Sequence, residues 1–351
     1  MEKTDLLHNK DRKRKLLIAL FIFLALLALK AYLDLFSPNV VKVSEPKELA
    51  IYVNEQKQLS SVLFQLKQGK FLENQSSFER IANWVQLGDK LKSGKYVLSP
   101  NMSNAAIIKM LFKGRQQPVD VVFKYAERTS EISACFSNQL MIDSSSLNSL
   151  LSDTTYLRSI GFNSDNILGL FIPNTYNFYW NIDMFSFLAR MEKEYQSFWD
   201  EERINLARDL GLSQKEASTL ASIVQKESNK IEEMSVIAGV YLNRINLGMP
   251  LQADPTIIYA WNDKSIKRVT SLHTAIVSPY NTYTQLGLPP GPICTPSIQA
   301  INAVLHATKH KYLYFCARED FSGYHTFAHT FAQHLQNASK YQRALNKRRV
   351  F

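Results

Sequence analysis

An apolar run close to the N-terminus constrains how the rest of the chain can fold. Residues 16–29 are uninterrupted hydrophobic side chains, and residues 31–33 extend the run past Lys30. With this extension the run approaches the roughly 20 residues that a helix needs to cross a bilayer. A basic cluster at residues 10–15 precedes it, and the positive-inside rule places that end in the cytoplasm. The sequence therefore predicts a cytoplasmic tail over residues 1–15, a single transmembrane helix over residues 16–36, and export of everything that follows.

The alternative for this run is a cleaved signal peptide, whose apolar region is about 7–15 residues long. No small-residue cleavage site of the A-x-A kind follows closely, and no cysteine adjoins the run as in a lipoprotein. We therefore favour an uncleaved anchor in the bacterial inner (plasma) membrane, with the folded part outside the cytoplasm. An exported enzyme has no supply of ATP or nicotinamide, so hydrolytic or lyase chemistry without a cofactor is expected.

The 351 residues carry a net charge of +10, part of it at the two ends of the chain. Such charge suits nucleic acid, anionic lipid or an anionic wall polymer. No helix-turn-helix, zinc-finger or RNA-binding motif is present, and we expect no nucleic-acid partner. The three cysteines lack CxxC spacing, so they predict neither a disulfide framework nor a metal site, and at most one pair can form.

The exported part reads as two folded regions of the α+β class behind a short linker over residues 37–48. The first region, residues 49–123, alternates strands (51–53, 94–98 and 119–123) with amphipathic helices (59–69, 76–87 and 103–112). Ser103 is the expected cap of the third helix and Gly114 its end. The second region, residues 124–351, is expected to be a larger mixed α/β domain that ends in a hairpin (312–317 with 324–327) and a helix capped by Thr330.

A single carboxylate in the second region carries the chemical signal. Ser213 and Glu216 form a capping box, which starts a helix. At about 100° per residue, Glu227 falls on the same stripe as Leu220, Ile223 and Val224. Burial raises the pKa of a carboxyl group, which suits a general acid working near neutral pH. The plain structural alternative is a buried ion pair, for which Arg244 is the available partner.

Loops rich in proline, glycine, tyrosine and amides follow this helix, at residues 249–259, 278–283 and 287–293. Such loops are stiff, and they suit a groove that offers aromatic faces, amides and hydroxyls to a polar ligand such as a sugar. Taken one at a time, each loop is equally well explained as a structural turn.

Six blocks of sequence at these positions resemble the endolytic murein transglycosylase family, also called MltG or YceG-like. They are ASIVQKES (221–228), VYLNR (240–244), LQADPT (251–256), SPYNTY (278–283), GLPPG (287–291) and HTF (325–327). Two weaker blocks, LKSGKY (91–96) and FIPNTY (171–176), extend the resemblance across nearly the whole exported part.

The resemblance implies a membrane anchor, a LysM-like module and a catalytic domain of lyase activity, with Glu227 as the catalytic residue. The expected reaction cleaves the bond between N-acetylmuramic acid and N-acetylglucosamine inside peptidoglycan strands and leaves a 1,6-anhydro end. This would terminate or trim nascent strands, and peptidoglycan synthases are candidate partners. The chain departs from the family pattern at Gln225, where many members carry another glutamate. Leu168 and Asn174 likewise replace common acidic residues, so acidic help from that segment is not expected.

Seven further residues are candidates for substrate binding: Asn243, Gln252, Asp254, Thr256, Tyr280, Asn281 and Tyr283. Three other readings stay open at this stage. The chain could be a non-catalytic peptidoglycan-binding scaffold, or a glycan hydrolase that leaves reducing ends. It could also be a metal hydrolase using His325, His329 and His334, although a change from strand to helix among them spoils the ligand spacing.

Overall fold

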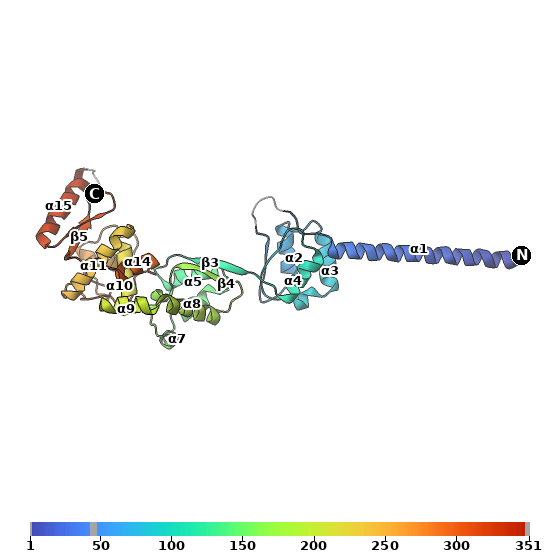
Figure 1. Ribbon diagram of the computed structural model, residues 1–351, viewed down its shortest axis with the longest axis horizontal. Helices are drawn as coiled ribbons and strands as arrows, with labels where there is room; N and C mark the ends of the chain where they lie inside the picture. Colours follow the sequence, from blue (N-terminus) through green and yellow to red (C-terminus); the bar gives the residue numbers. More distant parts are fainter. Residues whose placement is uncertain (1, 43–47, 348–351) are drawn as a thin grey trace. The chain divides into compact units, whose positions relative to one another are not determined.

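The computed structural model describes residues 2–42 and 48–347, residues 2–11 by their backbone alone (Figure 1). It divides into two compact units, one with the residues up to 119 plus 177–181, the other with residues 120–176 and those from 182 on. Part of the predicted linker (43–47) and the basic residues Arg348 and Arg349 lie outside the described residues. The first unit contains α1 (Glu2–Phe36), β1 (Ala50–Val53), α2 (Leu59–Gln68), α3 (Gln75–Trp84), the 3₁₀ helix η1 (Leu87–Lys90), β2 (Gly94–Val97) and α4 (Asn104–Lys113).

The remaining elements lead into and build the second unit. They are β3 (Pro118–Phe123), α5 (Thr129–Ser137), α6 (Ser144–Leu150), α7 (Thr154–Ser159), η2 (Ile167–Leu170), β4 (Asn174–Tyr179), α8 (Met184–Phe198), α9 (Glu201–Asp209), α10 (Gln214–Glu227), α11 (Ile231–Asn246), α12 (Asp254–Trp261), α13 (Ser271–Thr274), α14 (Ile298–Leu305), β5 (Tyr314–Ala317), β6 (His325–Ala328) and α15 (Phe331–Lys347).

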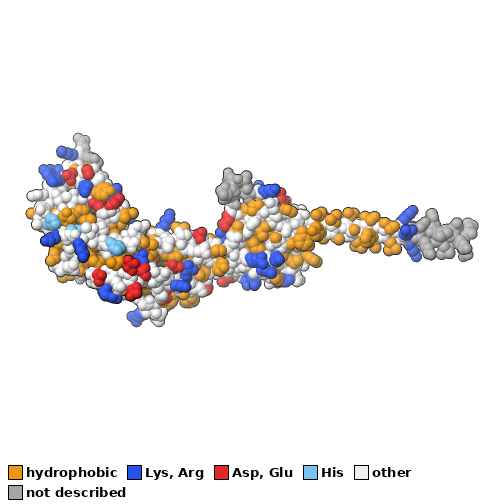
Figure 2. All heavy atoms as spheres, viewed as in Figure 1, with side chains coloured by type: hydrophobic (Ala, Val, Ile, Leu, Met, Phe, Trp, Pro, Cys, Tyr) orange, Lys and Arg blue, Asp and Glu red, His pale blue; other side chains and the backbone are white. Residues whose placement is uncertain are grey.

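Helix α1 contains the predicted apolar run without interruption. Within the described residues it is the one helix long and apolar enough to cross a membrane, and its apolar side chains from Leu16 to Leu33 are exposed (Figure 2). Its last turn, in contrast, contacts α3 and α4. The Asp34 carboxylate pairs with Arg80 at 3.0 Å, and the Asp34 carbonyl accepts a hydrogen bond from Asn104 at 2.8 Å. The end of the apolar helix is thus part of the first unit.

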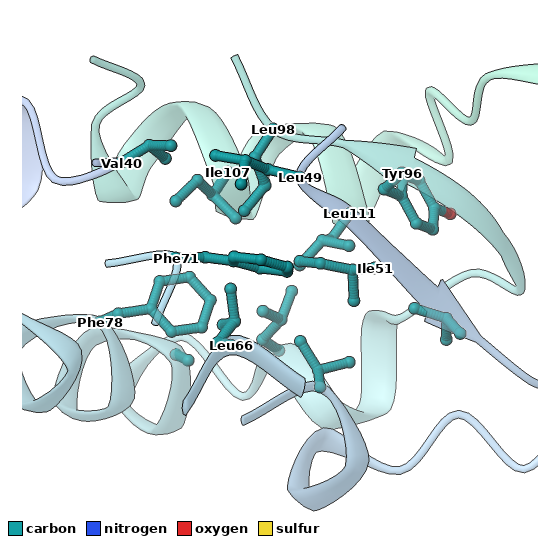
Figure 3. Close-up of a cluster of buried hydrophobic side chains, with 14 of the residues drawn as sticks. Val40, Leu49, Ile51, Leu66, Phe71, Phe78, Tyr96, Leu98, Ile107 and Leu111 are labelled. Carbon is teal, nitrogen blue, oxygen red and sulfur yellow. The ribbon is translucent and has the colours of Figure 1, made fainter. Parts of the chain in front are cut away.

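The first unit has its own core, which β1, β2 and helices α2 to α4 build together (Figure 3). The strands are antiparallel, and Ile51 lies opposite Tyr96, both fully buried. Ile107 and Leu111, one turn apart on α4, close the cluster from the helical side. Ser103 caps α4 and Gly114 ends it in a left-handed conformation (φ 66°), both as predicted. The helix expected over residues 76–87 ends earlier, because Gln86 adopts a left-handed backbone and a 3₁₀ turn follows.

Helix α10 lies at the centre of the second unit, packed against α11, α12 and α14. Every residue from 217 to 224 is buried, so the helix has no solvent face over two turns. Small side chains make this close packing possible: Ser222, for example, donates to the Thr219 carbonyl and accepts from the Ile293 amide. A helix buried all round fixes the position of whatever its last turn carries.

The predicted C-terminal hairpin and helix are present. Strands β5 and β6 pair antiparallel, with Phe315 opposite Phe327, and Thr330 accepts a hydrogen bond from the Gln333 amide at the start of α15. The expected α+β class is confirmed in its coarse form. The expectation of a mixed α/β second domain is not met, because the described residues there form helices with only short two-stranded sheets.

A buried amide ties α1 to the first unit and should dominate its response to mutation. Asn104 is 1% exposed; it donates to the Asp34 carbonyl and to Ser77, and accepts from Asn39. We expect Asn104→Ala to lower the free energy of unfolding by about 3 kcal/mol, because it leaves buried polar groups without partners. Chemical denaturation of the full chain in detergent measures this, with hydrogen exchange in α3 and α4 locating the loss. Gln68→Ala, at an exposed position of α2, is the control, and an equal effect of both substitutions would contradict the role of Asn104.

Candidate active site

Glu227 is the last residue of α10, and the start of that helix is built as predicted. The Ser213 side chain accepts from the Glu216 amide, and the Glu216 carboxylate accepts from the Ser213 amide at 2.8 Å. With the preceding two turns buried, the end of α10 delivers the Glu227 side chain to a pocket of about 390 Å³. The pocket is lined by Glu227, Tyr241, Arg244, Leu251, Gln252, Asp254, Tyr283, Tyr314, Phe315, Cys316, Ala317, His325, Phe331 and His334.

The surroundings of Glu227 favour the protonated form of its carboxyl group over the ionised form. Burial raises its pKa to about 7, a hydrogen bond from Tyr241 acts in the opposite direction, and the negative charge of Asp254 raises it further. The carbonyl end of α10 also disfavours a carboxylate. The Tyr241 hydroxyl donates to Glu227 Oε1 at 2.6 Å. One carboxyl oxygen is therefore fixed by the protein, and the other is available to a ligand.

The ion pair considered as the structural alternative does not form. Arg244 donates through Nη2 to Gln252 Oε1 at 2.7 Å, and its guanidinium lies 5.4 Å from the centre of the Tyr314 ring. Among the residues that the structure describes, Glu227 takes part in no ion pair. Burial lowers the pKa of Arg244, and its position in the pocket adds a polar donor for a ligand. The pocket thus keeps its acid and its cation apart.

Three of the seven predicted binding residues line this pocket with Glu227. Gln252 is bound by Arg244, and its own backbone takes a left-handed conformation (φ 53°). Asp254 begins α12, and its carboxylate accepts a hydrogen bond from the Tyr283 hydroxyl. Gln252, Asp254 and Tyr283 therefore form one wall around the acid.

The other four predicted residues are not among those that line the pocket; they bind backbone or buried hydroxyl groups. Asn243 donates to the carbonyls of residues 310 and 312, and Asn281 to those of residues 274 and 276. Thr256 bonds to the Ala253 carbonyl and to Thr282, and the ring of Tyr280 packs on Tyr259. Each of the four makes contacts within the protein, and any direct contact with substrate stays a prediction.

A second wall comes from β5, β6 and α15, from which the sequence analysis named only His325 and His334, and these as metal ligands in an alternative reading. Tyr314, Phe315 and Cys316 on β5 and Phe331 and His334 on α15 line it. Tyr241 was also missed, although one signal was available. It lies three residues before Arg244, so that both occupy one face of α11 and both are buried.

The three histidines considered as metal ligands have separate environments. His325 bonds to Glu233, His329 stacks on Tyr312, and His334 stacks on Tyr314. Among the side chains of residues 12–42 and 48–347, no three of His, Cys, Asp or Glu are grouped as ligands of one metal ion. The cysteines Cys135, Cys294 and Cys316 are all unpaired.

The raised pKa predicts how stability depends on pH. Below pH 4.5 the Glu227 carboxyl is protonated in both the folded and the unfolded chain; between 4.5 and about 7 only the folded chain keeps the proton. The contribution of the Glu227 proton to stability is therefore lost progressively as pH rises from 4.5 to about 7. We expect Glu227→Gln to be more stable than the wild type by about 2–3 kcal/mol at pH 8, with the difference shrinking as pH falls toward 4.5.

Thermal unfolding of both proteins across this pH range measures the effect. Glu232→Gln, at an exposed position of α11, is the matched control and should show no such dependence. A constant difference between wild type and Glu227→Gln at all pH values would contradict a raised pKa.

Comparison with known proteins agrees with this architecture. The chain matches the profile of the YceG-like family over residues 51–340. It is 27% identical over 342 aligned residues to an endolytic murein transglycosylase of Streptococcus pneumoniae, covering 86% of this chain but 60% of that relative, which is less than two thirds of its length. An endolytic murein transglycosylase of Bacillus subtilis is 26% identical over 306 residues, with 83% and 84% covered.

A solved structure gives the same result for the fold. The crystal structure of a YceG-like protein from Listeria monocytogenes matches with a TM-score of 0.54 at 25% identity, and the match covers 83% of this chain and 99% of that one. Because the family profile spans most of the sequence, the chain belongs to the YceG-like family.

Proposed function

We propose that this protein is an endolytic peptidoglycan lytic transglycosylase with Glu227 as its acid and base. The observation that carries the proposal is a carboxyl group whose pKa is raised to about 7, fixed at one oxygen by Tyr241, in an accessible pocket. The relatives named endolytic murein transglycosylase support murein as the substrate. We place the cut at the bond between N-acetylmuramic acid and N-acetylglucosamine within a glycan strand. Cutting there would terminate or trim nascent strands.

In the proposed reaction Glu227 first donates a proton and later accepts one, so it ends in its starting protonation state. Protonated Glu227 donates to the glycosidic oxygen, which keeps the electron pair of the breaking bond while an oxocarbenium-like centre develops at C1. The resulting carboxylate takes the proton of the C6 hydroxyl of the same muramic acid. The C6 oxygen bonds to C1, which closes the 1,6-anhydro ring without water and leaves Glu227 protonated again.

Asp254 has a supporting part in this proposal. Its negative charge raises the pKa of Glu227, which favours the protonated carboxyl group near neutral pH. Tyr283 donates to its carboxylate and holds it in place. A fixed anion in the same pocket also favours positive charge on the sugar as the bond breaks.

We further propose that α1 is an uncleaved anchor in the inner membrane and that the first unit is a LysM-like module. The hydrogen bond and ion pair of Asp34 support the anchor over a signal sequence, because removal of the helix would leave buried Asn104 without one of its partners. Peptidoglycan strands are the proposed ligand, and peptidoglycan synthases remain candidate partners.

Replacing the proposed acid tests the chemistry directly. We expect Glu227→Gln to reduce the formation of anhydro ends by about 10²–10⁴-fold, because an amide cannot donate the proton. Mass spectrometry of uncrosslinked glycan digested by the purified full chain in detergent measures the products. Glu216→Gln, the same substitution at the start of the same helix, is the control that should keep activity.

The products also separate the rival functions. Wild-type formation of anhydro ends by Glu227→Gln would contradict the proposal and indicate another catalytic group. No products from the wild type or from the variant would favour a scaffold. Reducing ends from the wild type, in place of anhydro ends, would identify a hydrolase.

The pH profile provides a second test. Because Glu227 must carry a proton, activity should fall as pH rises through about 7. Asp254→Asn removes a negative charge that raises the pKa of Glu227, so we expect the midpoint of that fall to move to lower pH. Rates measured from pH 5 to 9 for both proteins check the direction of the shift. An unmoved midpoint would show that Asp254 does not act on Glu227.

A further inference from the structure

Glu233 is a buried carboxylate that binds a histidine of the pocket. It is 6% exposed in the first turn of α11, and both of its oxygens are used by one residue of β6. The His325 backbone N–H donates to Oε1 at 2.9 Å, and Nδ1 of the same residue lies 3.0 Å from Oε2. A carboxylate can only accept, so Nδ1 carries the hydrogen.

This contact fixes which nitrogen of His325 is basic. In the neutral ring with its hydrogen on Nδ1, Nε2 holds the lone pair, and no group among the described residues bonds to it. The ring lines the Glu227 pocket and packs edge-on against Phe315. His310 is different, since both of its ring nitrogens bond to backbone groups. His325 is held at one nitrogen and open at the other.

Three of the other acceptor groups in the pocket each have one oxygen already engaged, whereas Glu227 Oε2 is open and Nδ1 of His334 has no partner among the described residues. Tyr241 binds Glu227 Oε1, Arg244 binds Gln252 Oε1, and the Tyr283 hydroxyl binds an oxygen of Asp254. A hydroxyl-rich ligand needs acceptors, and an acceptor on the same pocket as the acid can orient a hydroxyl toward the reacting centre.

We propose that His325, positioned by Glu233, binds the C6 hydroxyl of the muramic acid and directs its oxygen at C1. This inference rests on the proposed function. The hydroxyl donates to Nε2 until its proton passes to the Glu227 carboxylate, and His325 takes no net proton. Its role is to make the internal hydroxyl the nucleophile in place of water.

Two variants remove this role by different routes. His325→Phe keeps a ring against Phe315 but has no acceptor. The His325 backbone N–H is always a donor, so in Glu233→Gln the amide oxygen must face it. The NH₂ group of the amide then faces Nδ1. Nδ1 then accepts, the hydrogen moves to Nε2, and Nε2 becomes a donor.

The experiment measures the ratio of anhydro to reducing ends made from uncrosslinked glycan by the full chain in detergent. We expect both variants to lower this ratio by about tenfold, the loss typical of one hydrogen bond to a reacting group, because water can then trap C1. His329→Gln, exposed and outside the pocket, should keep the wild-type ratio. Nitrogen-15 spectra of histidine-labelled protein should show the Nδ1-protonated form of His325 in the wild type and its loss in Glu233→Gln.

An unchanged ratio in Glu233→Gln overturns the inference, and that variant decides alone if His325→Phe does not fold. The proposed function is tested separately by Glu227→Gln. Loss of activity in Glu227→Gln together with a wild-type ratio in Glu233→Gln would leave the transglycosylase standing and remove His325 from it.

Discussion

The site depends on the complete burial of α10 over its two turns before Glu227. Because residues 217–224 have no solvent face, the end of the helix cannot move without disturbing α11, α12 and α14. A glutamate on a mobile loop would turn toward water and ionise near its ordinary pKa. Here the packing holds the carboxyl in a poorly solvated pocket, which is the main reason that its pKa is raised to about 7.

The same packing would be useless for acid chemistry if the nearest cation neutralised the carboxylate. A buried Glu–Arg pair would lower the pKa of Glu227, and the carboxyl group would be deprotonated at neutral pH. Arg244 is instead bound by Gln252 and Tyr314, while the charge near Glu227 is that of Asp254, which has the same sign. The separation of these charges explains how one pocket can hold an acid, an anion and a cation with distinct roles.

The sequence predicted best what is decided by neighbouring residues. The caps at Ser103 and Ser213 and the position of Glu227 follow from helix periodicity and capping, which need no tertiary information. The second wall of the pocket could not be found in this way, because α10 and β5 are about 90 residues apart and only long-range packing joins them. Amides such as Asn243 and Asn281 look alike in sequence whether they bind sugar or backbone, and in the structure they bind backbone carbonyls.

Those backbone contacts still bear on the proposed catalysis, since a transition state is stabilised only by groups already in position. Asn281 holds the loop that carries Tyr283, and Tyr283 holds Asp254, whose charge acts on Glu227. Asn243 binds the segment that leads into β5, and β6 carries His325 against Glu233. Polar residues one step behind the pocket therefore fix both of its walls. In the proposed reaction a single acid needs such support, because the nucleophile is a hydroxyl of the substrate that must reach C1 before water does.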